Sequence, residues 1–444
     1  MIIEAISAYI NMMYRWRLGV DGGLMKVCVI GNGGREHALA WRLSISPSVT
    51  KVYAIPGSAA MSDCAELVGI DWQQSDHLIS FLKDNQVDLV VVGPEAPLVA
   101  GLADVLNKAG IPVFGPSKAA AQLEGSKVFA KDLMKKYNIP TAAYGVFHKV
   151  DEAKEFIRQT GAPIVVKADG LAAGKGVVVV MTIDEANAAV EDMLSGNRFG
   201  EAGSTVVIEE FMEGEEASLL AFVDGKTVVP MIASQDHKRI FDGDKGPNTG
   251  GMGTYAPAPV LTDALRDEAM KTILEPMVGA MQKEGMPYVG CLYAGLMITA
   301  EGPKVVEFNA RFGDPETQVV LPLLDSDLGQ IMMACATGNL TAHMVKWKDS
   351  SAACVILASK GYPETSSKGD VIHGDIKQHD TTIVFHSGTK LVGEEYVTNG
   401  GRVLGVVGLG KDLRTALDRA YGRIEHINFE GMQYRTDIGA KAFK

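Results

Sequence analysis

Short apolar segments alternate with segments of helical periodicity along the first quarter of the chain. Each apolar segment is followed at once by glycine or proline, and helical periodicity covers His37–Leu43 and Leu98–Ala109. Short apolar strands that alternate with helices predict a parallel, doubly wound sheet of the α/β class. Such sheets bind ligands at the carboxyl ends of their strands. The four predicted strands are Val27–Ile30, Val52–Ile55, Leu89–Val92 and Ile111–Phe114.

The pattern changes further along the chain. Residues 117–145 are charged and helical in pattern, whereas all periodicity is lost between Gln235 and Gly253, which predicts a long functional loop. From about residue 350, short strands and turns follow one another. The predicted helices of this part are Ala264–Glu284 and Leu413–Ile424. The predicted strands are Ile164–Lys167, Val177–Val180, Val206–Glu210, Ser218–Val223, Gly290–Thr299, Lys304–Phe308, Ala352–Ala358, Thr382–His386 and Gly405–Gly410.

Composition narrows the class of protein. A chain of 444 residues has room for two to four domains, and 47% hydrophobic with 22% charged residues is typical of soluble globular proteins. The formal net charge of −12 argues against a nucleic-acid partner. Five cysteines without a CxxC pair favour a reducing compartment, so a cytoplasmic protein is expected. Since no run of about 18 apolar residues occurs, no membrane span is expected.

Residues 1–24 are expected to form an extension outside the fold. Arg15 and Arg17 follow the apolar part of this segment, whereas the basic residues of a signal peptide precede it. Met25 then opens the strand-like sequence MKVCVIGNGG, which resembles the start of a protein.

The first glycine-rich turn, Gly31-Asn32-Gly33-Gly34, lies between a strand and a helix. Glycines there let backbone amides approach an anion at a helix N-terminus. A dinucleotide site is disfavoured, because Glu36 stands where the GxGxxG fingerprint needs its last glycine, and the second strand ends without an acidic residue for a ribose. The turn therefore indicates a phosphate or sugar-phosphate site, with a tight structural turn as the alternative.

A second glycine-rich segment follows Lys167 and contains Gly174, Lys175 and Gly176. It is not the GxxxxGK[ST] P-loop, because Val177 follows Gly176 and no helix comes next. A glycine-rich hairpin can fold over a triphosphate while a lysine neutralises its charge. An exposed hairpin with solvated lysines is the alternative.

An acidic run from Glu209 to Glu216 follows the apolar strand Val206–Ile208. Charge runs are usually solvated faces, and that is one interpretation. The other is a nucleotide site, because the backbone at a strand end can hydrogen-bond the edge of an adenine. A carboxylate that follows can then accept hydrogen bonds from ribose hydroxyls.

The strand near residue 307 carries polar side chains on one face. Glu307 and Asn309 point to the same side of a strand, and Arg311 continues that face. A carboxylate and an amide oxygen suit Mg²⁺, and an arginine can hold a phosphate or a carboxylate. A buried hydrogen-bond network is the alternative. The preceding strand, Gly290–Thr299, has no acidic residue, so any further protein ligand must come from elsewhere.

Weaker candidates lie in the predicted loop. Asp236-His237-Lys238-Arg239 could bind anions or form a solvated basic turn, and Asn248-Thr249-Gly250 offers amides to another anionic group. His37, His343 and His426 lack a serine or cysteine nucleophile signature nearby, so no catalytic triad is expected.

Together these motifs resemble the glycinamide ribonucleotide synthetase family of the ATP-grasp superfamily. The similarity runs from Met25 to the C-terminus through MKVCVIGNGGREHAL, VGPEAPL, KADGLAAGKGV, QDHKR, GPNTGGMG and EFNARFGDPETQ. The resemblance implies a doubly wound N-terminal domain at 25–126 and an ATP-grasp domain at 127–348 with a lid at about 146–217. A small α+β C-terminal domain at 349–444 completes the chain.

The resemblance also implies an activity. ATP, with Mg²⁺ or Mn²⁺, would drive the ligation of glycine to 5-phosphoribosylamine in purine biosynthesis, with ADP and phosphate released. Neither nucleic acid nor a membrane is expected as a partner, and the expected assembly is a monomer or a weak dimer.

Individual roles follow from the same resemblance. The residues expected to bind ATP are Lys127 and Lys167 at the phosphates, Gly174, Lys175 and Gly176 in the closing loop, Glu209, Glu210, Phe211 and Met212 at the adenine, and Glu215 or Glu216 at the ribose. The expected metal ligands are Glu307 and Asn309. The expected substrate residues are Gly31, Asn32, Gly33, Gly34, Glu95, Asn248, Thr249 and Gly250, with Asp236, Lys238 and Arg311 as catalytic residues.

Three other functions compete with this one. Another ATP-grasp carboxylate–amine ligase is the nearest, and GNGGREH together with GPNTGGMG argues against it. An NAD-dependent oxidoreductase is weakened by Glu36, and a non-catalytic nucleotide-binding regulator is opposed by Glu307 and Asn309.

Overall fold

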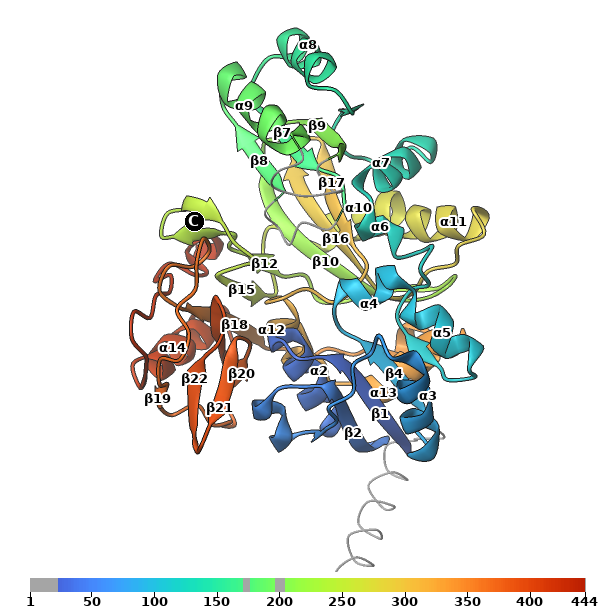
Figure 1. The fold of residues 1–444 in the computed structure, drawn as a ribbon, viewed down its shortest axis with the longest axis vertical. Helices are drawn as coiled ribbons and strands as arrows, with labels where there is room; N and C mark the ends of the chain where they lie inside the picture. Colours follow the sequence, from blue (N-terminus) through green and yellow to red (C-terminus); the bar gives the residue numbers. More distant parts are fainter. Residues whose placement is uncertain (1–22, 171–175, 196–203, 444) are drawn as a thin grey trace, which may run out of the picture.

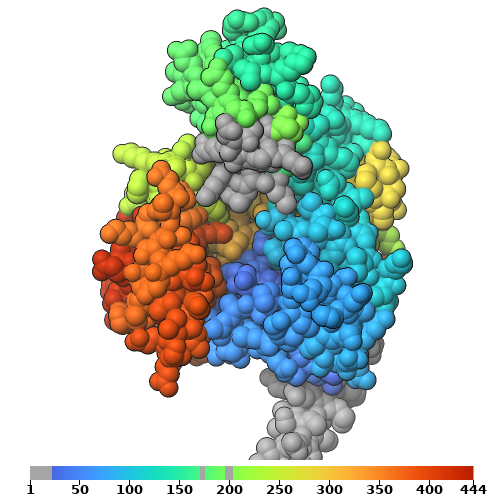
Figure 2. All heavy atoms as spheres, viewed as in Figure 1, coloured from blue at the N-terminus to red at the C-terminus, as the bar shows by residue number. Residues whose placement is uncertain are grey.

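The computed structural model describes residues 23–170, 176–195 and 204–443 (Figure 1). The predicted loop residues Gly174 and Lys175, and residues 1–22 of the predicted extension, lie outside this part of the chain. None of the described helices is both long and apolar enough to cross a membrane. The chain forms a small lobe at the top of the view, with N-terminal and C-terminal lobes below it (Figure 2).

The N-terminal lobe is a five-stranded parallel sheet in the order β3-β2-β1-β4-β5, which confirms the predicted doubly wound sheet. The strand order reverses at β1, so the glycine-rich turn after β1 lies at the switch point where such sheets bind ligands. The elements are β1 (Met25–Gly31), α2 (Gly34–Ser44), β2 (Val49–Pro56), η1 (Ala59–Asp63), β3 (Glu66–Leu67), α3 (Ser75–Asp84), β4 (Leu89–Val92), α4 (Glu95–Ala100), α5 (Leu102–Lys108) and β5 (Val113–Phe114).

Two helical predictions are partly wrong. The segment predicted as one helix, Leu98–Ala109, falls in two helices, α4 and α5, because Gly101 between them is left-handed with φ of 98°. Of residues 117–145, only α6 (Gln122–Gly125) and α7 (Lys127–Lys136) are helical by hydrogen bonding. The chain leaves the helix where Asn138 has φ of 54° and Pro140 disfavours a helical residue before it.

The small upper lobe is a four-stranded antiparallel sheet in the order β6-β9-β7-β8, covered by α8 and α9 (Figure 1). Its buried apolar side chains, such as Ile157, Val190 and Ile208, form a separate core. The upper lobe is therefore stabilised by a hydrophobic core of its own. The elements are β6 (Tyr144–Phe147), α8 (Val150–Thr160), β7 (Ile164–Ala168), β8 (Val177–Val180), α9 (Ile183–Leu194) and β9 (Val206–Glu210).

The central sheet is antiparallel in the order β11-β10-β16-β17. Its apolar side chains share one core with the N-terminal lobe, where Leu98 and Leu106 join Leu219 and Leu292. The predicted helix Ala264–Glu284 is confirmed, with a π-helical turn in its middle. The elements are β10 (Glu215–Asp224), β11 (Val228–Pro230), α10 (Asp263–Ala269), the π turn Met270–Leu274, α11 (Glu275–Lys283), β16 (Val289–Thr299) and β17 (Gly302–Asn309).

The predicted long loop between Gln235 and Gly253 is wrong in part, because it contains a β-hairpin. Positive φ values at Gly243, Asp244 and Gly246 turn the chain between two short strands. These strands are largely exposed, so no apolar alternation marks them in the sequence. The elements are β12 (Gln235–Asp236), β13 (Arg239–Phe241), β14 (Lys245–Asn248) and β15 (Gly253–Ala256).

The C-terminal lobe is a five-stranded sheet in the order β12-β15-β18-β23-β20. Two of its strands thus come from the middle of the chain, and α14 packs on β18 and β23. The segment before this lobe contains α12 (Thr317–Val320), η4 (Leu321–Leu323), α13 (Leu328–Thr337) and η5 (Ala342–Met344), and α13 packs against β10, β16 and β5. The elements of the C-terminal lobe are β18 (Ser351–Ala358), β19 (His373–Gly374), β20 (Thr382–His386), β21 (Thr389–Val392), β22 (Glu395–Thr398), β23 (Arg402–Gly410), α14 (Leu413–Ile424), β24 (Ile427–Asn428) and η6 (Ala440–Phe443).

Candidate active site

The end of β17 carries the predicted metal ligands and the predicted catalytic arginine. Arg311 donates a hydrogen bond to Asn309 Oδ1 (3.2 Å) and pairs with Glu124 (2.9 Å) and Glu95 (3.4 Å). Burial raises the pKa of Glu307, but Lys238 and other cations around it outweigh burial and hold that pKa below its usual range. Glu307 is therefore an anion at neutral pH, which is the form that can ligate a metal.

A buried ion-pair cluster lies where β7, β9 and α7 meet. The Glu209 carboxylate pairs with Lys167 (2.9 Å) and Lys131 (3.1 Å), and Lys167 also donates to the Val306 carbonyl (3.0 Å). Burial lowers the pKa of Lys131 to about 8, although Glu209 opposes that shift. Glu209 Oε2 makes both pairs, whereas Glu209 Oε1 is buried and has no hydrogen-bond partner among the residues that the structure describes.

Lys127 lies at the first turn of α7, beside the segment that contains the glycine-rich loop. Its ammonium donates to the Gly170 carbonyl (2.9 Å), and its backbone N–H donates to the Asp169 carboxylate (2.6 Å). Burial lowers the pKa of Lys127, while Glu307 opposes the shift. Gly176, the last residue of the predicted loop, lies directly before β8 and is buried.

The acidic run is split between two environments. Glu210 is exposed and accepts from Ala143 N (3.3 Å), while Phe211 and Met212 are half-buried where β9 ends. Glu216 forms an ion pair with Lys238 (2.6 Å), whereas Glu215 is exposed and accepts only from the side chain of Gln235 (3.4 Å) among the described residues. Of the two carboxylates predicted for a ribose, Glu215 is thus the less occupied.

Asp236 and Lys238 both interact electrostatically with the carboxylates of Glu216 and Glu307. Burial raises the pKa of Asp236 to about 7; Lys238 lowers it, and Glu316, Glu216 and Glu307 add to the increase. Burial lowers the pKa of Lys238, but Glu216, Asp236 and Glu307 together raise it well above its usual value. A carboxyl group poised near neutral pH beside a permanent cation is suited to proton transfer.

The predicted substrate segment at Asn248–Gly250 is tied to the C-terminal lobe. Thr249 donates to the Lys238 carbonyl (2.8 Å), Gly250 N donates to the hydroxyl of Tyr362 (3.0 Å), and Arg402 donates to the Gly250 carbonyl (2.7 Å). Hydrogen bonds through this segment therefore connect the backbone of Lys238 with Arg402 of β23.

The β1–α2 turn explains why glutamate replaces the last glycine of the fingerprint. Glu36 folds back to accept a hydrogen bond from Gly33 N (2.7 Å), and Arg35 pairs with it (2.5 Å). A Cβ at Gly31 or Gly93 would overlap the Glu36 side chain, so both glycines make room for it. Arg35 also lies 3.9 Å from Glu95 and donates to the Phe312 carbonyl (3.1 Å), which connects the turn with Arg311.

Three residues of this site were not predicted as site residues from the sequence, namely Lys131, Glu124 and Arg35. Lys131 lies one helical turn after Lys127, and that spacing in α7 was the available signal. Glu124 lies far from the β17 motif in the sequence, although it accepts from Ala310 N (2.7 Å) and holds Arg311. No local sequence pattern predicts a contact between such distant segments.

Lysines from α7 and from the upper lobe converge on an acidic strand end, an arrangement that fits an enzyme of the ATP-grasp class. Residues 125–317 match the "Phosphoribosylglycinamide synthetase, ATP-grasp (A) domain". Residues 25–124 match the N domain and residues 352–441 the C domain of the same family. The chain belongs to the phosphoribosylglycinamide synthetase family, which confirms the resemblance seen in the sequence.

Relatives of this family match almost the whole chain. Phosphoribosylamine–glycine ligase of Halalkalibacterium halodurans is 53% identical over 418 residues, covering 94% of this chain and 97% of the relative. The enzyme of that name from Neisseria meningitidis serogroup A is 53% identical over 420 residues, covering 94% and 99%.

Solved structures agree with the fold. The crystal structure of phosphoribosylamine–glycine ligase from Thermotoga maritima superposes with a TM-score of 0.82 at 33% identity, covering 93% of this chain and all of that one. The biotin carboxylase domain of a Hydrogenobacter thermophilus carboxylase, solved with MgADP, has a TM-score of 0.71 at 16% identity, covering 93% and 92%. The second likeness concerns the fold alone.

Proposed function

We propose that this protein ligates glycine to 5-phosphoribosylamine at the expense of ATP, giving glycinamide ribonucleotide, ADP and phosphate in the cytoplasm. The main support for this proposal is one cluster of side chains. Lys127 and Lys167 lie near enough to Glu307 to lower its pKa, and Asn309 and Arg311 follow Glu307 at the end of β17. Relatives named for this reaction are about half identical over nearly the whole chain.

The residues present fit a nucleotide. Glu209 Oε1 is a buried acceptor that has no partner within the described part of the chain, and the exocyclic amine of an adenine is a donor that would satisfy it. Lys167 pairs with the other oxygen of this carboxylate, and Lys127 interacts with it electrostatically, so both lysines can supply positive charge to the phosphates of a nucleotide bound here. Glu215, exposed at the start of β10, is available to ribose hydroxyls.

The residues also fit a magnesium ion that is shared with phosphates. Within the described residues, no group of three or more His, Cys, Asp and Glu side chains is arranged to hold a metal by itself. Glu307 and Asn309 supply two oxygen ligands, and Mg²⁺ usually takes its remaining ligands from phosphates and water. When bound, Mg²⁺ would act as a Lewis acid at the phosphates.

The chain's own groups then have three tasks. Lys127 and Lys167 neutralise the triphosphate, and Arg311, fixed by Glu124 and Glu95, orients an anionic reactant. Since no serine, cysteine or histidine has a nucleophile signature, the glycine carboxylate itself is the group that attacks the γ-phosphorus. That attack would release ADP and give a glycyl phosphate. Asp236 is suited to take a proton from the amine of phosphoribosylamine as the amine attacks the carbonyl carbon of this intermediate and displaces inorganic phosphate.

An isotope experiment tests this route. Glycine with heavy oxygen at both carboxylate positions should transfer one labelled oxygen to the released phosphate per turnover, while the product amide keeps the other. Amide formation with unlabelled phosphate, or AMP and pyrophosphate in place of ADP and phosphate, would refute it. Full turnover with another amine, and none with phosphoribosylamine, would favour a different ATP-grasp ligase.

A further inference from the structure

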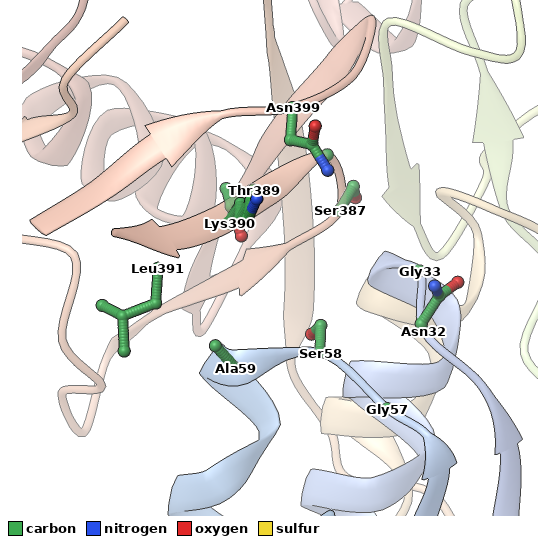
Figure 3. A pocket seen from close by; sticks show the side chains of 11 residues that line it. Asn32, Gly33, Gly57, Ser58, Ala59, Ser387, Thr389, Lys390, Leu391 and Asn399 are labelled. Carbon is green, nitrogen blue, oxygen red and sulfur yellow. The ribbon is translucent and has the colours of Figure 1, made fainter. Parts of the chain in front are cut away.

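Two polar regions of the C-terminal lobe face segments from earlier in the chain. At the β1–α2 turn, Ser387 and Asn399 line a cavity of about 470 Å³, across from Asn32 and Ser58 (Figure 3). After β24, residues 435–441 contact the β13–β14 hairpin through direct hydrogen bonds and ion pairs. Direct bonds fix the position of the groups that they join, so the second region can determine where the hairpin lies.

Arg435 is the centre of the contact with the hairpin. Its side chain is among the largest of the fully buried ones, at 1% exposed. It forms a bidentate pair with Asp437, from Nε to Oδ1 (2.7 Å) and from Nη2 to Oδ2 (2.8 Å). Its Nη1 donates to Asp244 Oδ1 (2.8 Å) and to the Arg239 carbonyl (3.1 Å). One guanidinium therefore joins the C-terminal segment to the first strand and to the turn of the hairpin.

Neighbouring residues of the C-terminal segment bond the same hairpin turn. The additional contacts are Gly243 N donating to Asp437 (2.8 Å), Thr436 N donating to Asp242 (2.8 Å) and Lys441 pairing with Asp244 (2.7 Å). The segment is itself tied to α14, because the Tyr421 hydroxyl donates to the Arg435 carbonyl (2.9 Å). The hairpin turn is thus held by a part of the chain that is anchored in turn.

The contact includes the residues on both sides of Lys238. The carbonyl of Arg239 accepts from Arg435, and the His237 ring accepts at Nε2 from Gly439 N (3.4 Å). Burial lowers the pKa of His237 to about 4, and nearby cations add to the decrease, so the ring is neutral and can accept. A lysine has a long, flexible side chain, so the position of its ammonium depends on how firmly the backbone is held.

The hairpin has little hydrophobic core of its own. Ile240 is the only buried residue of β13 and β14, and an isolated two-stranded hairpin is marginally stable. The Lys238 side chain is 32% exposed in its pair with Glu216, and such exposed pairs contribute little to stability. The bonds from the C-terminal segment therefore make a large share of what fixes the hairpin.

Stability alone does not account for a buried arginine at this position. Buried ion pairs are often no more stabilising than apolar residues of the same volume. A bidentate pair between an arginine and a carboxylate adds a fixed geometry, which an apolar contact does not. The Arg435–Asp437 pair thus suits the orientation of the hairpin better than it suits a gain in stability.

We propose that Arg435 is a positioning residue for the ligase reaction, because it fixes Lys238 in the active site through the β13–β14 hairpin. This inference rests on the proposed function and adds a part of the C-terminal lobe to the residues on which turnover depends. Arg435 acts through Lys238 and not through contact with a substrate.

The experiment compares two variants of this contact with a matched ion pair elsewhere in the same lobe. The variants are Arg435→Lys, which loses the fork, and Asp244→Asn, which loses a charge at a residue whose φ of 54° asparagine tolerates. The controls are Arg423→Lys and Asp375→Asn, because Arg423 pairs with Asp375 and donates to the Lys377 carbonyl, away from the hairpin. For each protein, kcat, the Michaelis constants and the free energy of unfolding are measured.

A displaced Lys238 should lower kcat roughly tenfold or more in Arg435→Lys, and severalfold in Asp244→Asn. The Michaelis constant for ATP should stay within about twofold, since Lys127 and Lys167 are held by bonds to Gly170 and Val306. Both control variants should keep the wild-type kcat even where they lower the free energy of unfolding.

A double-mutant cycle tests whether Arg435 acts through Lys238. In a Lys238→Gln background, Arg435→Lys should change kcat by less than about twofold, because the group that it positions is already gone. Arg423→Lys should have no effect on kcat in either background. An equal loss of kcat from Arg435→Lys in both backgrounds would refute the inference.

Other results would also overturn it. If Arg435→Lys and Asp244→Asn lower the free energy of unfolding but leave kcat within about twofold of the wild type, the contact supports only the fold. Should Arg435→Lys not fold, an unchanged kcat in Asp244→Asn would refute the inference by itself. In these cases the ligase function stands. If the wild type makes no glycinamide ribonucleotide from phosphoribosylamine, the proposed function fails, and the inference fails with it.

Discussion

Replacing Lys131 by methionine should change how the stability of the protein depends on pH. Lys131 is 2% exposed, and its pKa is lowered from 10.5 to about 8. A lysine with a lower pKa in the folded state binds fewer protons there than in the unfolded state. Its contribution to stability is therefore fully present above pH 10.5 and is lost as pH falls toward 8. At 1.36 kcal/mol per pH unit, this interval corresponds to about 3 kcal/mol.

The assay compares unfolding of the wild type and Lys131→Met from pH 7 to pH 10. The free energy of unfolding of the wild type, minus that of the variant, should rise with pH by up to about 3 kcal/mol. Lys135→Met is the matched control, since Lys135 is an exposed residue of the same helix and its replacement should leave the pH dependence unchanged. Parallel pH curves for the wild type and Lys131→Met would refute the reasoning.

The same variant tests the link to function. Without Lys131, the Glu209 carboxylate keeps only Lys167 as an ion-pair partner, which draws the Lys167 ammonium toward Glu209 and away from phosphates. The Michaelis constant for ATP should rise severalfold, while that for glycine stays unchanged. Unchanged ATP dependence would mean that Lys131 only supports the fold.

Three further changes test other parts of the site. Glu307→Gln should lower turnover by orders of magnitude while the protein still folds, and near-normal turnover at saturating Mg²⁺ would contradict the metal assignment. Gly93→Ala should destabilise the protein by about 1–3 kcal/mol in thermal unfolding, because its Cβ overlaps Glu36, whereas Gly279→Ala has open space and should not. The pH–rate profile should show a rise near pH 7 as Asp236 ionises, and Asp236→Asn should abolish that rise; an identical profile in the variant would exclude Asp236 as the base.

Strands and most turns could be predicted because the local sequence pattern determines them. Leu89–Val92, Val177–Val180, Val206–Glu210 and Thr382–His386 have the predicted bounds, since each is a short apolar run. The hairpin β13–β14 within the predicted loop could not be predicted, because its exposed strands have no alternation of apolar and polar residues.

The site was predictable in its motifs but not in its internal pairing. Glu209 was expected among the residues at the adenine, yet its carboxylate is occupied on one oxygen by Lys131 and Lys167. That outcome depends on the Lys131–Glu209 ion pair, which joins α7 to β9, two segments that are distant in the sequence. The same holds for Glu124 and Arg311, which are brought together only by the folded chain.

The shared sheet of the C-terminal lobe limits how the chain can be divided. β15 pairs with β18 along Gly253–Ala256, and β12 joins it from Gln235. A fragment starting near residue 349 would therefore expose the open edge of β18, whose eight residues are all buried in the intact chain. Such an edge is a template for intermolecular pairing. The C-terminal lobe should consequently aggregate when expressed by itself, and it cannot be exchanged between relatives as a module unless the segment from 235 to 256 is transferred with it.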